Sequence, residues 1–145
     1  MIQGVLIGID FGERRIGLAK SDSTGLIASA YKTITFKSIN RALDEIREDI
    51  ENFKAEGVVI GYPLALTGGS AGERCQRVDE FILRLQKRYP GPIYRVDERF
   101  SSTEAAEAVH LHQKKIGRDK GKIDRIAAAI ILQRFLDEQR EAEHN

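Results

Sequence analysis

The order of strand-like and helix-like segments is the feature of this sequence that most constrains its fold. Three strand-like runs, at residues 5–9, 16–19 and 27–35, come before the first helical pattern. The first two are separated by a short polar segment in which Gly12 suits a tight turn. The chain is therefore expected to begin with three strands, of which the first two form a hairpin.

After residue 38 the pattern changes to an alternation of helices and short strands. The expected elements are, in order, a helix from 38 to about 57, a strand at 58–60, a helix from 70 to about 89, a strand at 93–96, a helix at 101–112 and a final helix from about 122. Helices between strands require parallel pairing. The prediction is an α/β fold with a mixed five-stranded sheet, three antiparallel strands first and then parallel strands, flanked by helices.

The length and the cysteine content bound the kind of protein. A chain of 145 residues has the size of one domain, and we expect that domain over residues 1–138, with a flexible tail at 139–145. Cys75 is the single cysteine and cannot form an internal disulfide. The first apolar run is too short to span a membrane or to form a signal core. These features predict a cytoplasmic protein.

Three carboxylates stand where predicted elements begin or end. Asp10 closes the first strand, Glu98 follows the strand at 93–96, and Asp124 lies in the first turn of the last helix. Oxygen ligands of this kind are what Mg²⁺ prefers, and two such ions about 4 Å apart can promote phosphodiester hydrolysis. Each residue also has a local explanation, as a turn residue, a surface ion pair or a helix N-terminal acid. The spacing alone leaves both interpretations open.

Four ordered motifs resemble those of the YqgF/RuvX family. They are GIDFG at 8–12 with RIGLA at 15–19 and SD at 21–22, GYPL at 61–64 with GGS at 68–70, DERFSS at 97–102, and KID at 122–124 with AAAIILQ at 127–133. The similarity extends over about residues 5–136. It implies an RNase H-like fold related to that of Holliday-junction resolvases, and a role in trimming the 5′ end of precursor 16S ribosomal RNA.

The resemblance also implies the roles of particular residues. By it, Asp10, Glu98 and Asp124 are the catalytic, metal-binding carboxylates, and the expected cofactor is Mg²⁺ or Mn²⁺, as two ions. Asp97 competes with Glu98 for this role, since neighbouring strand residues point to opposite faces of a sheet. We favour Glu98.

Several cations are candidates for contacts with nucleic acid. Arg99 follows Glu98 and is expected to contact a phosphate, whereas Arg15 is expected to pair with a carboxylate for structural reasons. The other predicted phosphate contacts are Lys114, Lys115, Lys120 and Lys122 of a basic segment and Ser70 at a helix N-terminus. A solvated loop and ordinary helix capping are the alternatives for these two groups.

The leading hypothesis is a nuclease that processes precursor 16S ribosomal RNA. A resolvase-type DNA endonuclease and a non-catalytic nucleic-acid-binding protein are the alternatives. The expected partner is nucleic acid, as precursor ribosomal RNA or branched DNA, with no membrane, and the expected state is a monomer or weak homodimer. Residues 8–12 also resemble the first phosphate loop of actin-like ATPases and sugar kinases, but those proteins close two lobes around the nucleotide and this chain is long enough for one.

Overall fold

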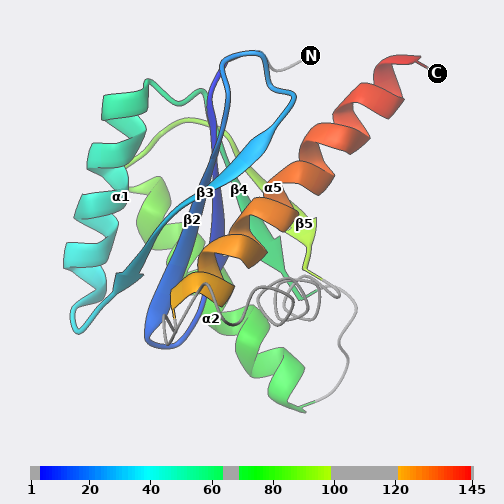
Figure 1. Ribbon diagram of the computed structural model, residues 1–145. Helices are drawn as coiled ribbons and strands as arrows, with labels where there is room; N and C mark the ends of the chain where they lie inside the picture. Colours follow the sequence, from blue (N-terminus) through cyan, green and yellow to red (C-terminus); the bar gives the residue numbers. More distant parts are fainter. Residues whose placement is uncertain (1–3, 64–68, 99–120, 145) are drawn as a thin grey trace, which may run out of the picture.

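A five-stranded mixed sheet forms the centre of the protein in the computed structural model, which describes residues 4–63, 69–98 and 121–144. Its strands are β1 (Leu6–Phe11), β2 (Arg15–Ser21), β3 (Ala28–Thr35), β4 (Gly57–Tyr62) and β5 (Ile93–Asp97), in the spatial order β3-β2-β1-β4-β5 (Figure 1). The first three pair antiparallel, and β4 and β5 run parallel to β1. The predicted five-stranded mixed sheet, with three antiparallel strands first and parallel strands after them, is confirmed.

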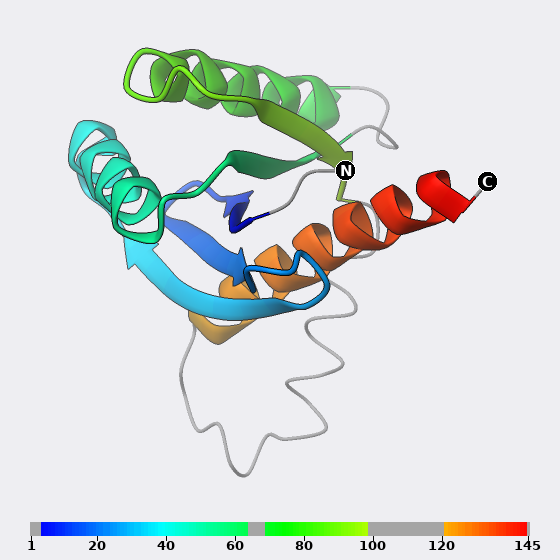
Figure 2. The ribbon, with the colours of Figure 1, turned by 90° about the horizontal axis from the view of Figure 1, so that it is seen from above.

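Helices cover both faces of this sheet. Figure 2 shows α5 (Gly121–His144) on one face and α1 (Ile39–Phe53) with α2 (Gly69–Gln86) on the other. Helix α1 begins where the sequence predicts, since the Ser38 side chain accepts a hydrogen bond from the Arg41 N–H at 3.4 Å. The arrangement therefore has three layers, with one hydrophobic core on each side of the sheet.

Alternation along β1 assigns its side chains to these two cores. Ile7 and Ile9 are fully buried in the core beneath α1 and α2, whereas Leu6 belongs to the core beneath α5. Because successive strand residues point to opposite faces, Asp10 points toward α5 and Phe11 toward α2. The end of β1 thus presents a carboxylate on one side of the sheet and an aromatic ring on the other.

Helix α5 differs from the predicted last helix at its C-terminal end. A flexible tail was expected from residue 139, but the helix continues to His144. Leu136 is its last buried residue, so packing stops where the tail was predicted, while the Glu, Gln, Arg and Ala residues beyond it favour helix without burial. The predicted helix at 101–112 and the polar segment that follows it lie outside the described residues.

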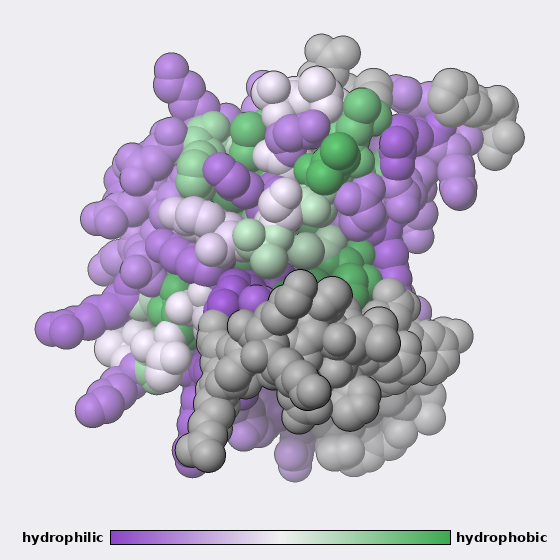
Figure 3. Space-filling view, viewed as in Figure 1, coloured by the Kyte–Doolittle hydropathy of each residue, from purple (hydrophilic) through white to green (hydrophobic). Residues whose placement is uncertain are grey.

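Figure 3 shows the face of the protein that carries α5. Hydrophilic residues dominate the edges of this view, and hydrophobic residues form small separate areas within it. Within the described residues, none of the helices is both long enough and apolar enough to cross a membrane.

Candidate active site

A row of residues across the sheet positions the site. Asp10 of β1 pairs with Gly17 of β2, which pairs with Thr33 of β3. On the other side of β1, the partner of Ile9 in β4 is followed directly by Gly61. Residues in register on neighbouring strands point to the same face. Asp10 therefore points toward α5 with a glycine on each side of it.

These two glycines leave space for the other two carboxylate residues. A Cβ atom at Gly17 would lie 2.0 Å from the backbone oxygen of Asp124 in α5. A Cβ atom at Gly61 would lie 3.3 Å from Cβ and 3.4 Å from Oε2 of Glu98. Asp124 thus lies over one glycine and Glu98 over the other, on either side of Asp10.

Strand alternation separates Glu98 from its neighbour Asp97. Val96 is buried in the core beneath α5, so Asp97 points to the opposite face and Glu98 returns to the face of Asp10. The Glu98 N–H donates to the Tyr62 carbonyl at 3.0 Å, which continues the pairing one residue beyond β5. The structure therefore places Glu98, and not Asp97, with the other two carboxylate residues.

The start of α5 is attached to the edge strand β3. The Thr33 hydroxyl donates to the Gly121 carbonyl at 2.5 Å, and Arg125 donates to the Thr33 Oγ1 at 3.2 Å. These bonds hold the first turn of α5, and with it Asp124, against the sheet. Arg15 pairs with Asp124, with 2.7 Å between Nε and Oδ2, as the sequence predicted for this arginine.

Glu98 also pairs with an arginine. Arg74 of α2 places its Nη2 atom 2.5 Å from Glu98 Oε1, and the Glu98 side chain is only 12% exposed. Sequence reasoning did not identify Arg74, because a charged residue on a helix surface carries no sign of what it will meet across the fold.

The surroundings of Asp10 strongly raise the pKa of its carboxyl group. Burial, and then the negative charges of Glu98 and Asp124, raise the pKa of Asp10 from 3.8 to about 7, while the positive charge of Arg74 opposes the rise. Burial also raises the pKa of Glu98, against the lowering effect of Arg74. Among the described residues, Asp10 forms no ion pair. Its site therefore carries negative charge that a cation would relieve.

The chemistry of these donors fits a hard divalent cation, which binds carboxylate oxygens. In the part of the chain that the structure describes, no three Asp, Glu, His or Cys side chains are close enough together to hold one ion. Arg15 pairs with Asp124, and Arg74 pairs with Glu98. For a cation to bind all three carboxylates, Asp124 and Glu98 would have to release their arginine partners.

The remaining predicted residues are only partly within the described structure. Lys122 lies in the first turn of α5, partly exposed, two residues before Asp124. Ser70 lies in the first turn of α2, and its side chain is outside the described part. Residues outside the described structure are Arg99, Lys114, Lys115 and Lys120.

Comparison with known proteins decides the family. A family model described as "RuvX: Holliday junction resolvase" matches residues 4–138. The chain belongs to the RuvX family. Two relatives with the name "Putative pre-16S rRNA nuclease" are 40% identical in Synechococcus elongatus and 43% identical in Gloeobacter violaceus. Both alignments cover 93% of this chain, and they cover 90% and 85% of those relatives.

Solved structures show the fold of this RuvX-family chain. T. thermophilus RuvC in complex with a Holliday junction substrate has a TM-score of 0.60 at 17% identity, over 94% of this chain and 96% of RuvC. The fowlpox virus resolvase in complex with Holliday junction DNA has a TM-score of 0.55 at 11% identity, over 93% and 98%. The predicted RNase H-like fold is confirmed. The family match over nearly the whole chain gives no support to the ATPase or sugar-kinase alternative.

Proposed function

We propose that this protein is a metal-dependent nuclease that hydrolyses phosphodiester bonds in nucleic acid, with Asp10, Glu98 and Asp124 as its metal-binding carboxylates. The observation that carries the proposal is the convergence of the three residues on one face of the sheet, where burial and mutual repulsion raise the pKa of Asp10 to about 7. The proposed cations are Mg²⁺ or Mn²⁺, as two ions. When bound, they would neutralise phosphate charge and activate water.

The chain's own residues would prepare this site in two ways. Strand β1 and the glycines beside it hold Asp10 between the other two carboxylate residues. Arg15 and Arg74 neutralise Asp124 and Glu98. When these carboxylates bind a cation instead, the same guanidinium groups become available to phosphate oxygens, which accept paired hydrogen bonds from arginine.

The proposed substrate is precursor 16S ribosomal RNA. The names of the relatives at 40% and 43% identity support this choice. A four-way DNA junction is the second candidate, supported by the description of the family. Cleavage of two opposed strands of a junction is expected to need a symmetric dimer, whereas trimming of one RNA end is expected of a monomer.

The test is cleavage of both substrates side by side with Mn²⁺. The wild-type protein is expected to cleave a precursor RNA with a 5′ extension, Asp10→Asn to reduce cleavage to background, and Glu48→Gln, at an exposed position of α1, to retain the wild-type rate. Cleavage of the junction alone would replace the proposed substrate by the second candidate. Undiminished cleavage by Asp10→Asn, or binding of RNA without any cleavage by the wild-type protein, would overturn the proposal.

A further inference from the structure

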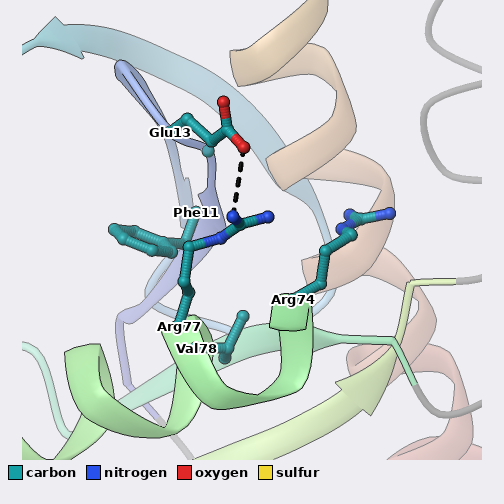
Figure 4. A pocket seen from close by; sticks show the side chains of 6 residues that line it. Phe11, Glu13, Arg74, Arg77 and Val78 are labelled. Carbon is teal, nitrogen blue, oxygen red and sulfur yellow. Dashed lines mark ion pairs between the residues drawn. The ribbon is translucent and has the colours of Figure 1, made fainter. Parts of the chain in front are cut away.

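A cleft of about 250 Å³ lies between the β1–β2 turn and α2. Figure 4 shows its lining, which is made by Phe11, Gly12, Glu13, Arg74, Arg77 and Val78. In this view Arg74 and Arg77 both rise from the same side of α2, and Arg77 reaches Glu13. The cleft therefore has two arginines on one wall and a single acid opposite them.

Arg74 connects this cleft with the carboxylate site. It lines the cleft and at the same time pairs with Glu98. Phe11, also in the lining, directly follows Asp10 on β1 and points to the opposite face of the sheet. The cleft thus begins at the end of β1, next to the proposed reaction site, and continues on the α2 side.

The partner of Arg77 is readily exchanged. Arg77 Nη1 lies 3.2 Å from Glu13 Oε1, with the two side chains 43% and 71% exposed. Ion pairs this exposed contribute little to stability. A phosphodiester offers the guanidinium the same single negative charge and paired acceptor oxygens as a carboxylate, so it can replace Glu13 as the partner of Arg77.

A second hollow, of about 370 Å³, shares Phe11, Glu13 and Arg77 with the cleft and extends to Arg84. Positions 74, 77 and 84 lie on one face of α2, and at 1.5 Å per residue they extend over about 15 Å. Arg84 forms no ion pair with any described residue. The two hollows share part of their lining and form one groove, in which Arg74, Arg77 and Arg84 outnumber the acids Glu13 and Glu80.

We propose that this groove holds the nucleic-acid strand on one side of the scissile phosphodiester, and that Arg77 and Arg84 each bind one of its phosphates. The inference rests on the proposed function. It adds contacts that are separate from those predicted for Lys114, Lys115, Lys120 and Lys122. Continuity with the carboxylate site through Arg74 favours the substrate strand itself over another occupant. Glu13 holds Arg77 in place until the strand arrives.

The experiment measures binding of a labelled single-stranded oligoribonucleotide by fluorescence anisotropy at several salt concentrations. All variants are made in the Asp10→Asn protein with Mg²⁺, so that binding is measured without turnover. Arg77→Ala and Arg84→Ala are each expected to weaken binding several-fold and to reduce the slope of log K against log salt by about 0.7, the value for one phosphate contact with a single strand. Glu13→Gln is expected to tighten binding. The gain is expected to be smaller when Glu13→Gln is combined with Arg77→Ala.

Arg47→Ala is the matched control. Arg47 of α1 forms a similarly exposed ion pair, with 3.1 Å between its Nε and Glu51 Oε1, and its loss changes the net charge equally. It is expected to leave the slope unchanged. Slopes for Arg77→Ala and Arg84→Ala equal to that of Arg47→Ala would overturn the inference, as would weaker binding by Glu13→Gln. Cleavage by the wild-type protein is scored separately, so a binding result of either kind does not depend on whether the nuclease proposal holds.

Discussion

Replacement of Asp10 by asparagine is expected to stabilise the metal-free protein at neutral and alkaline pH. Burial, followed by the charges of Glu98 and Asp124, raises the pKa of Asp10 in the folded protein to about 7 from 3.8. The folded state therefore keeps a proton that the unfolded chain releases, and stability falls as pH rises from about 4 to about 7. The interval between the two pKa values corresponds to about 4 kcal/mol in the free energy of unfolding. Through Asp10 alone, the wild-type protein is less stable by this amount above pH 7 than it is below pH 4. Asparagine cannot ionise and removes this cost.

Urea unfolding in the presence of EDTA measures the effect. Between about pH 4.5 and pH 8, the advantage of Asp10→Asn over the wild-type protein is expected to grow by about 3 to 4 kcal/mol. Glu48→Gln removes an exposed carboxylate of α1 and is expected to show no such growth. An advantage of Asp10→Asn that is the same at every pH, or a loss of stability at pH 8, would refute the electrostatic reasoning.

Two further substitutions test the packing and the choice of carboxylate. Gly17→Ala is expected to lower the free energy of unfolding by about 1 to 3 kcal/mol, because its Cβ would lie 2.0 Å from the Asp124 carbonyl oxygen. The control Gly72→Ala has no atom within 4 Å of its Cβ and is expected to raise the free energy of unfolding by about 0.5 to 1 kcal/mol. A change of the same sign in both variants would contradict the close approach of α5 to the sheet. Glu98→Gln is expected to weaken Mn²⁺ binding in calorimetry much more than Asp97→Asn, and equal effects would show that strand alternation does not decide the ligand.

Local patterns were sufficient to predict most of the sheet. The polar segment between the first two strands encodes a turn, and a change of apolar spacing at Ser38 marks the start of a helix that is capped by this residue. The short buried run that became β4 lies between Gly57 and Pro63, and Pro92 directly precedes β5, so both runs are too short for helices. These signals depend on neighbours in sequence, so they can be read without knowledge of the fold.

The surroundings of the carboxylates could not be predicted in the same way. The motifs point to Asp10, Glu98 and Asp124, and strand alternation predicts that only one of Asp97 and Glu98 faces the site. The close contact of Gly17 with Asp124, by contrast, depends on how α5 crosses the sheet. The pairing of Arg74 with Glu98 likewise joins residues 24 positions apart, on different elements. Contacts of this kind arise from tertiary packing, and a single sequence has no local signal for them.

The end of α5 shows the opposite error, in which absence of packing was taken for absence of structure. The residues after Leu136 lack the apolar side chains that a core would need, and a tail was therefore predicted. A helix that is already formed can continue through good helix formers at little cost. Burial and helicity thus end at different residues.

Anomalous diffraction from crystals of the protein soaked in Mn²⁺ tests the central claim most directly. A peak is expected between the carboxylates of Asp10, Glu98 and Asp124, with Arg74 and Arg15 moved away from the carboxylates with which they pair. A peak held by other residues, or no peak at Mn²⁺ concentrations that support cleavage, would contradict the assignment of these three carboxylates as the metal site.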